Sequence, residues 1–142
     1  MRVLGLDFGS RRVGVALSDP TGTFAQPLET IAHRGPRDVA LFRRIAVCVE
    51  EHEVGRIVIG LPLHMDGRKG PEAVAVESFG ARIAEQTKLP VEYLDERWTT
   101  VEAQRAFTEM GVRGRRAREH VDAVAATLIL RTYLDRRPGG DP

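Results

Sequence analysis

Apolar and polar residues alternate along residues 1–18 of the chain. The alternation runs from Val3 to Asp7, is interrupted by a turn at residues 9–12, and resumes at Val13. Alternation with a period of two is typical of half-buried β-strands, and the short glycine-containing turn predicts that these two strands form a hairpin. Residues 23–31 predict a third strand, and Pro27 places it at a sheet edge because proline donates no ladder hydrogen bond.

The rest of the chain alternates helical and strand patterns. Apolar residues at helical spacing predict a helix that opens at Gly35-Pro36, with proline in its first turn, and stops before Gly55. The later elements predicted in the same way are a buried strand at 56–62, a polar loop at 64–70, a helix from 71 to a break at 89–90, a strand at 91–96, a helix after a capping box at 99–102, and a final helix at 120–135.

This order of elements predicts an α/β fold. The first three strands are joined by hairpins and should be antiparallel, whereas the last two are joined through helical crossovers and should be parallel. The result is a mixed five-stranded sheet with helices on both faces. Small residues on one side of the second strand, at Gly14, Ala16 and Ser18, predict that a helix lies close to the sheet there. We expect one domain over 1–137 and a flexible tail over 138–142.

The composition excludes several classes of protein. The chain has 142 residues and no apolar run long enough to cross a membrane, so we expect no membrane partner. No signal-peptide pattern precedes the first strand, and we expect a cytoplasmic location. Cys48 is the only cysteine, which excludes a disulfide framework and a cysteine-based zinc site. We interpret Cys48 as a small, partly buried helix residue.

Four acidic residues stand near predicted strand ends or within an apolar helix. Asp7 ends the first strand, Asp95 and Glu96 end the last strand, and Asp122 interrupts an apolar helical run. Because the carboxyl ends of parallel strands lie along one sheet edge, Asp7 and Glu96 can share that edge, and the helix carrying Asp122 can cross it. Converging carboxylates repel one another unless a cation lies among them, and Mg²⁺ prefers such oxygen ligands. The pattern favours phosphodiester hydrolysis assisted by two metal ions.

Each of these acids also has a purely structural explanation. Asp7 could cap the turn that follows it. Asp122, expected in the first turn of its helix, could be there because an acid favours the helix dipole. Adjacent strand residues point to opposite faces, so only one of Asp95 and Glu96 is expected to ligate directly. We choose Glu96; Asp95 stays a possible ligand that could instead hold Arg97 or the hairpin backbone.

The net charge of +1 gives no argument for nucleic acid, but the distribution of arginine does. Only two of the 21 basic residues are lysines, and the guanidinium group of arginine matches phosphate oxygens. Several arginines lie next to the candidate acids and are predicted to bind nucleic acid: Arg11, Arg12, Arg97, Arg113, Arg115, Arg116 and Arg118. The alternative for the cluster at 113–118 is a solvated loop, although its density favours phosphate binding.

Four motifs together resemble those of the YqgF family, whose members are described as pre-16S rRNA nucleases or Holliday-junction resolvases. They are LGLDFGSRRVGVALSD, IVIGLPLHMDG, LDERWTT and HVDAVAATLILRTYL, and the resemblance covers nearly the whole chain. The family has a ribonuclease H-like fold, which agrees with the predicted strand order. The resemblance therefore implies a ribonuclease H-like nuclease domain.

The resemblance also implies a site and a substrate. It places the catalytic and metal-binding acids at Asp7, Glu96 and Asp122, with Asp95 beside them. It implies Mg²⁺ or Mn²⁺ as cofactor, and cleavage of structured RNA during maturation of the 5′ end of 16S rRNA in the cytoplasm. Branched DNA is the alternative substrate.

Three other activities stay open at this point. A Holliday-junction resolvase would act as a two-fold dimer because two symmetric strands must be cut, whereas an rRNA nuclease could be a monomer or a homodimer. The stretch from Asp7 to Ala16 is also similar to the phosphate loop of actin-like kinases and chaperone ATPases, but those proteins need two such domains. The third is a non-catalytic RNA-binding ribosome assembly factor.

Overall fold

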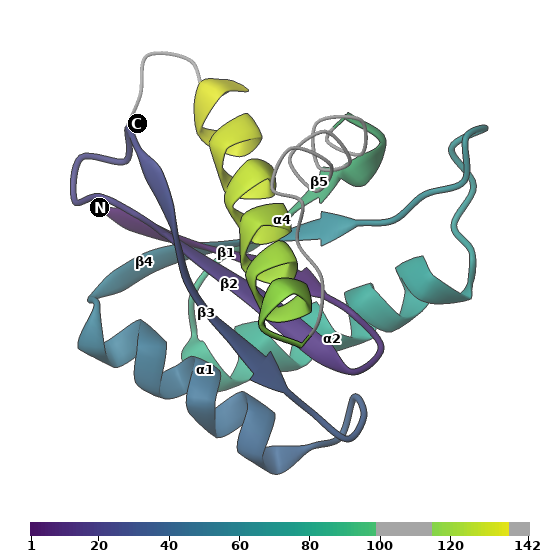
Figure 1. Cartoon of the computed structure of the whole chain (residues 1–142), viewed down its shortest axis with the longest axis horizontal. Helices are drawn as coiled ribbons and strands as arrows, with labels where there is room; N and C mark the ends of the chain where they lie inside the picture. The colour runs from purple at the N-terminus through teal and green to yellow at the C-terminus, as the bar shows by residue number, and fades with distance from the viewer. Residues whose placement is uncertain (99–114, 137–142) are drawn as a thin grey trace.

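A computed structural model of the chain describes residues 1–98 and 115–136. Its centre is a five-stranded sheet in the order β3-β2-β1-β4-β5 (Figure 1). The strands are β1 (Arg2–Phe8), β2 (Arg12–Ser18), β3 (Ala25–Ala32), β4 (Val54–Leu61) and β5 (Val91–Asp95). β1, β2 and β3 are antiparallel, and β1, β4 and β5 are parallel, as the sequence predicts. Pro27 lies in the edge strand β3, also as predicted.

The strand register brings the ends that carry the candidate acids to one edge of the sheet. Leu6 of β1 pairs with Ile59 of β4, and Leu61 of β4 pairs with Asp95 of β5. On the other side of β1, Asp7 pairs with Gly14 of β2. The carboxyl ends of β1, β4 and β5 therefore lie together, which is where ligands bind in sheets of this kind.

Helices cover both faces of the sheet. One core contains buried residues of α1 (Val39–Glu51) and α2 (Pro71–Thr87), and the other contains buried residues of α4 (Arg115–Arg136). In Figure 1, α4 crosses the front of the sheet while α1 and α2 lie on the other side. β1 lies between the two cores: Leu4 and Leu6 pack in the first and Val3 in the second, and all three are fully buried.

α4 approaches the sheet closely because glycines face it. A Cβ atom added at Gly14 of β2 would collide with the backbone carbonyl oxygen of Asp122. A Cβ atom added at Gly5 of β1 would lie 2.8 Å from the Cβ of Leu130. The prediction that the small residues of the second strand admit a helix is therefore confirmed, and the contact fixes the height of Asp122 above the sheet.

The predicted start of the first helix is wrong. α1 begins at Val39, and Asp38 is its N-cap, accepting a 3.0 Å hydrogen bond from the Ala40 N–H. Gly35 has φ of +142°, which a right-handed helix does not allow, so Gly35 and Pro36 belong to the loop after β3. An aspartate N-cap satisfies a free N–H group at the helix start, which proline in the same stretch cannot do.

The predicted start of the last helix is also wrong. α4 begins at Arg115, not at residue 120, so Asp122 lies about two turns inside the helix. The helix-dipole explanation for Asp122 therefore fails, because that effect is confined to the first turn. The charged residues before 120 lack apolar periodicity, but arginine is a good helix former. The helix expected after the capping box at 99–102 and the tail at 138–142 lie outside the described residues.

Candidate active site

The three candidate acids come from three distant segments of the chain. Asp7 is the second-last residue of β1, Glu96 opens the short 3₁₀ helix η1 (Glu96–Trp98) directly after β5, and Asp122 is in α4. Asp7 pairs with Gly14, and the backbone of Asp122 lies against that same glycine. Strand pairing and helix packing thus bring Asp122 to the part of the sheet that carries Asp7.

Asp7 and Glu96 form a partly buried pair of carboxyl groups joined by a hydrogen bond. Burial raises the pKa of Glu96 to about 8, and the charge of Asp7 acts in the same direction. Burial also raises the pKa of Asp7. The hydrogen bond from Glu96 lowers this pKa, and the negative charge of Asp122 raises it further. Two acids in contact at neutral pH are therefore held together by a proton that one of them retains.

The glycine of β4 makes room for Glu96. A Cβ atom added at Gly60 would lie 2.6 Å from Glu96 Oε1 and 2.5 Å from the Ile129 side chain. Sequence reasoning missed this role. The available signal was an isolated glycine inside the apolar run 57–61, because glycine within a strand often marks a close approach by another group.

Asp122 is held by an arginine of the β1–β2 hairpin. Arg12 Nε donates a 2.6 Å hydrogen bond to Asp122 Oδ2, and both side chains are partly exposed. In the described ranges 1–98 and 115–136, no group of three or more His, Cys, Asp or Glu side chains is arranged to hold a metal ion. The structure therefore brings Asp7 and Glu96 into contact and places the charge of Asp122 nearby, with its carboxylate paired to Arg12.

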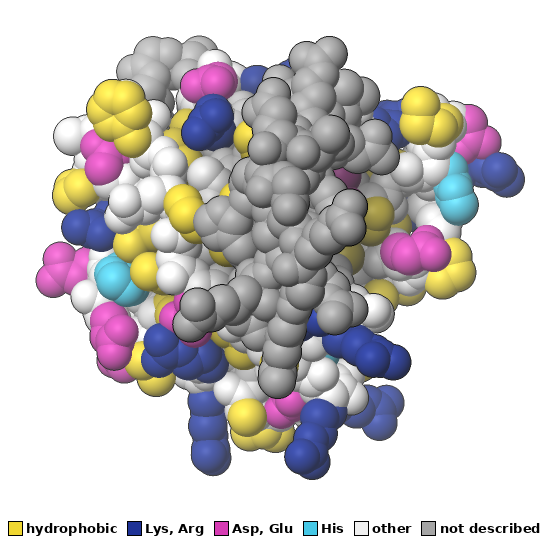
Figure 2. Space-filling view, in the orientation of Figure 1, with side chains coloured by type: hydrophobic (Ala, Val, Ile, Leu, Met, Phe, Trp, Pro, Cys, Tyr) yellow, Lys and Arg dark blue, Asp and Glu magenta, His cyan; other side chains and the backbone are white. Residues whose placement is uncertain are grey.

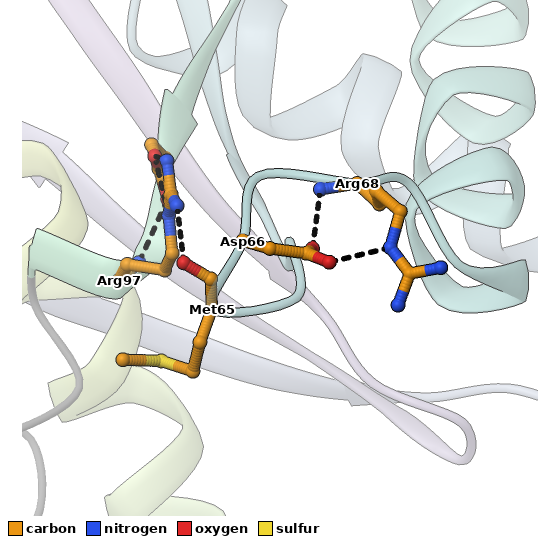
Figure 3. A network of polar contacts seen from close by, with 5 residues as sticks. Met65, Asp66, Arg68 and Arg97 are labelled. Atoms are coloured by element: carbon orange, nitrogen blue, oxygen red, sulfur yellow. Dashed lines mark hydrogen bonds and ion pairs between the residues drawn. The ribbon is translucent and has the colours of Figure 1, made fainter.

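Asp95 faces a different partner from Glu96. Its carboxylate accepts hydrogen bonds from the Arg97 backbone N–H at 3.0 Å and from Arg97 Nε at 2.9 and 3.0 Å. These bonds lower the pKa of Asp95. Arg97 also donates from Nη1 to the Met65 carbonyl oxygen at 3.0 Å, and Figure 3 shows this connection to the loop after β4. Of the two adjacent acids, Glu96 is the one that contacts Asp7.

The other predicted nucleic-acid contacts lie at the ends of elements around this edge. Arg11 is exposed in the β1–β2 turn, and Arg115, Arg116 and Arg118 belong to the first two turns of α4. Arg113 lies outside the described residues. Figure 2 shows Lys and Arg side chains gathered along the lower edge of the view, below the end at which α4 begins in Figure 1.

The surroundings of Cys48 keep its thiol protonated. It is buried in α1, and its Sγ donates to Glu29 Oε1 at 3.4 Å. Burial, followed by the charge of Glu29, raises the pKa of Cys48 to about 12. A thiol that stays protonated at neutral pH is a poor nucleophile, so the interpretation of Cys48 as a packing residue fits the structure.

No helix within the described part of the chain is long and apolar enough to span a membrane.

Comparison with known families identifies the chain. The family "RuvX: Holliday junction resolvase" matches residues 1–136. The chain belongs to the RuvX family. One relative in Pelotomaculum thermopropionicum, named "Putative pre-16S rRNA nuclease", is 44% identical over 135 residues, which cover 95% of this chain and 87% of the relative. A relative of the same name in Streptococcus gordonii is 47% identical over 137 residues, covering 96% and 99%.

Solved structures show the same fold as this RuvX chain. "T. thermophilus RuvC in complex with Holliday junction substrate" aligns over 100% of this chain and 99% of RuvC, with a TM-score of 0.58 and 17% identity. A second structure, of Thermus thermophilus RuvC, aligns with a TM-score of 0.53 and 12% identity. At these identities the likeness shows the fold alone, and it confirms the predicted ribonuclease H-like class.

Proposed function

We propose that this chain is a divalent-metal-dependent nuclease whose catalytic acids are Asp7, Glu96 and Asp122. The observation that carries the proposal is the partly buried contact between the Asp7 and Glu96 carboxyl groups, with the negative charge of Asp122 acting on Asp7. A fold has no structural need for three acids at one partly buried edge, because each added charge destabilises the others. Such an arrangement is retained where a cation or a reacting group uses it.

The donor set fits a hard divalent cation. All three side chains offer carboxylate oxygens, and Asp7 and Glu96 keep a proton between them where a cation could compensate their charges instead. Mg²⁺ or Mn²⁺ would be held by these acids, with Asp95 as a further possible ligand once Arg97 moves. When bound, such ions, two in our proposal, polarise the attacking water and stabilise the leaving oxygen of a phosphodiester.

Arg12 is suited to exchange one partner for another. It now neutralises Asp122 at 2.6 Å. A cation bound by Asp122 would compete with Arg12 for this carboxylate, and an Arg12 guanidinium released in this way is free to bind a phosphate oxygen of the substrate. Together with the predicted arginines at the start of α4, this would place a phosphate backbone across the edge that carries the acids.

The substrate we propose is structured RNA, with maturation of the 5′ end of pre-16S rRNA in the cytoplasm as the process. The support is the name shared by relatives that are 44–47% identical over nearly the full chain. A second candidate is a four-way DNA junction, favoured by the description of the matching family. That activity would require a homodimer, since the two cuts are related by a two-fold axis, whereas RNA cleavage is open to a monomer.

The test is side-by-side cleavage of a 16S precursor fragment and a synthetic four-way junction, with Mn²⁺ and with EDTA. We expect Mn²⁺-dependent cleavage of the precursor near its 5′ processing site and weaker cleavage of the junction. Paired symmetric cuts in the junction alone would select the resolvase. Binding of precursor without cleavage, unchanged in Asp7→Asn, would contradict a catalytic role and leave an RNA-binding assembly factor.

A further inference from the structure

The loop between β3 and α1 carries two arginines without an acidic partner. Arg34 and Arg37 are exposed, and within residues 1–98 and 115–136 no carboxylate forms an ion pair with either side chain. Arg44 on α1 differs in this respect, since it pairs with Glu29 at 2.6 Å. An exposed arginine alone is most often a solvated charge. The surroundings of Arg34 and Arg37 therefore decide whether this loop binds a ligand.

The same two arginines line a cavity of about 540 Å³, and Gly35, Pro36 and Asp38 complete its described wall. The volume lies in the range of roughly 300–1,000 Å³ that is typical of ligand sites. Asp38 is the one acid among the described residues of the wall. Its Oδ2 accepts from the Arg34 N–H at 2.9 Å, and its Oδ1 accepts from an N–H of the first turn of α1 at 3.0 Å. With two guanidinium groups against one carboxylate, the wall carries a net positive charge, which favours an anionic ligand.

His33 fixes this loop to the β1–β2 turn. Its backbone N–H donates to the Arg11 carbonyl oxygen at 2.9 Å, and its Nε2 donates to the Gly9 carbonyl oxygen at 2.8 Å. Its ring also stacks on Phe8, with the ring centres 5.2 Å apart. The other ring nitrogen, Nδ1, accepts from the Gly35 N–H at 3.0 Å. The imidazole thus holds one wall of the cavity against the turn at the end of β1.

These contacts place the cavity near the candidate acids. Gly9 follows Asp7 by two residues, and Figure 1 shows the β3–α1 loop beside the β1–β2 turn. A chain advances at most about 3.5 Å per residue, so the Cα atom of Arg37 lies within about 14 Å of that of His33. The cavity is therefore within about 34 Å of Asp7, which is one helical turn of a duplex. A duplex that is cut at the acids has other phosphates within reach of this loop.

We propose that the β3–α1 loop binds backbone phosphates of the nucleic-acid substrate through Arg34 and Arg37, away from the phosphate that is cleaved. The inference rests on the proposed nuclease function. The planar guanidinium group matches the oxygens of a phosphate, and contacts of this kind fix the position of a nucleic acid without reading its sequence. Arg11, exposed at the neighbouring turn, extends the same surface toward the acids. The loop thereby orients the substrate on the α1 side of the sheet, opposite the face that α4 covers.

A free anion is the alternative occupant of the cavity. Inorganic phosphate would need only Arg34 and Arg37. A substrate strand is favoured because Arg11 and Arg12 stand at the turn to which His33 ties the loop, so that arginines continue from the cavity to the acids. The two occupants differ in a measurable way, since only a strand makes the contribution of the loop depend on the length of the substrate.

The test compares two lengths of RNA. One 16S precursor fragment extends about 10 base pairs, a full helical turn, on each side of the cleavage site, and a trimmed hairpin keeps about three. Binding is measured by fluorescence anisotropy in EDTA, with Asp7→Asn in every chain so that nothing is cut. We expect Arg34→Gln together with Arg37→Gln to weaken binding of the long fragment about 10-fold and to make its slope of log affinity against log salt shallower by about 2. Binding of the hairpin should stay unchanged.

Arg131→Gln is the matched control, because Arg131 is an exposed arginine in the second half of α4, and it should change neither affinity. Equal losses for the two RNAs, or an unchanged salt slope for the long one, would overturn the inference. Saturable binding of inorganic phosphate that the double variant abolishes, with the affinity for the long fragment unchanged, would overturn it in favour of a free anion.

Cleavage in Mn²⁺ by chains with Asp7 intact separates this inference from the nuclease function. A parent chain that does not cut the precursor, with the length-dependent loss of binding still present, would overturn the nuclease function and leave the phosphate-binding loop standing. A parent chain that cuts, with no effect of the double variant on binding of the long fragment, would do the reverse.

Discussion

The carboxyl groups of Asp7 and Glu96 retain a proton under conditions in which isolated carboxyl groups have lost theirs. For Glu96 the pKa rises from 4.5 to about 8, chiefly through burial. The folded chain therefore binds more protons than the unfolded chain between these two values, and folding stability falls as pH rises through this window. The same acids that would hold a cation thus destabilise the chain at neutral pH when no cation is bound.

Removing one of the two charges should stabilise the metal-free chain. We expect Asp7→Asn to raise the urea midpoint in EDTA at pH 8, because the amide leaves Glu96 without a like-charged neighbour, and to have a much smaller effect at pH 5. Adding Mg²⁺ should stabilise the parent and reduce the difference at pH 8. A variant that is less stable than the parent at pH 8 in EDTA would contradict this explanation of the pair.

For single residues, the sequence predicts the identity of the acids better than it predicts their contacts. Asp7 and Glu96 can be placed at one edge because strand ends are recognisable from alternation and from the parallel connection. The ion pair of Arg12 with Asp122 joins residues 110 positions apart, and no local pattern encodes it. For Asp95, the sequence offers Arg97 or the hairpin backbone as partners, and the structure shows Arg97.

The contact of α4 with β2 decides where Asp122 lies. Gly14 is in direct contact with the backbone of Asp122, and Gly5 of β1 is in contact with Leu130 further along the helix. A helix can lie this close only where the strand lacks side chains. The position of the third acid therefore depends on a glycine of another element.

Gly14→Ala should consequently affect both stability and activity. The added methyl group would collide with the Asp122 carbonyl, so α4 must shift, and we expect a loss of about 3 kcal/mol in the free energy of unfolding. Cleavage should fall further than the folded fraction does. Gln26→Ala, at an exposed position of β3, is the control and should change neither quantity. A Gly14→Ala chain with parental stability and activity would show that neither property depends on the close contact between α4 and β2.

The elements themselves are predicted well where apolar periodicity is strong and poorly at their ends. All five strands and the helices at 39–51 and 71–87 are recognisable from the sequence. The pattern misplaces the start of α1 because the residue that begins the helix is the N-cap Asp38, whose side chain accepts a hydrogen bond from a backbone N–H of the first turn, and not Pro36. It misplaces the start of α4 because the first residues of that helix are charged and show no apolar period, although arginine favours a helix.

The whole molecule presents acids at one sheet edge and a basic helix start next to it. The net charge is only +1, so attraction of nucleic acid depends on how the arginines are distributed. α4 contributes to both features, since it begins with Arg115 and Arg116 and carries Asp122 two turns later.

Replacing Arg115 and Arg116 by glutamine should weaken precursor binding and flatten its salt dependence. For every phosphate that is no longer neutralised, the slope of log affinity against log salt should become shallower by about 1. Arg131→Gln, at an exposed position in the other half of α4, is the matched control and should leave the slope unchanged. A slope that stays the same in the double variant would show that the start of α4 does not bind phosphates.

The central claim is that three acids bind the divalent ions: Asp7, Glu96 and Asp122. It is tested most directly by the rate of precursor cleavage at saturating Mn²⁺ in the single variants Asp7→Asn, Glu96→Gln and Asp122→Asn. Circular dichroism and thermal unfolding would establish that each variant is folded. We expect each variant to lose at least about 100-fold in rate. A folded variant of any of the three that cleaves at close to the parental rate would contradict the assignment of that residue to the metal site.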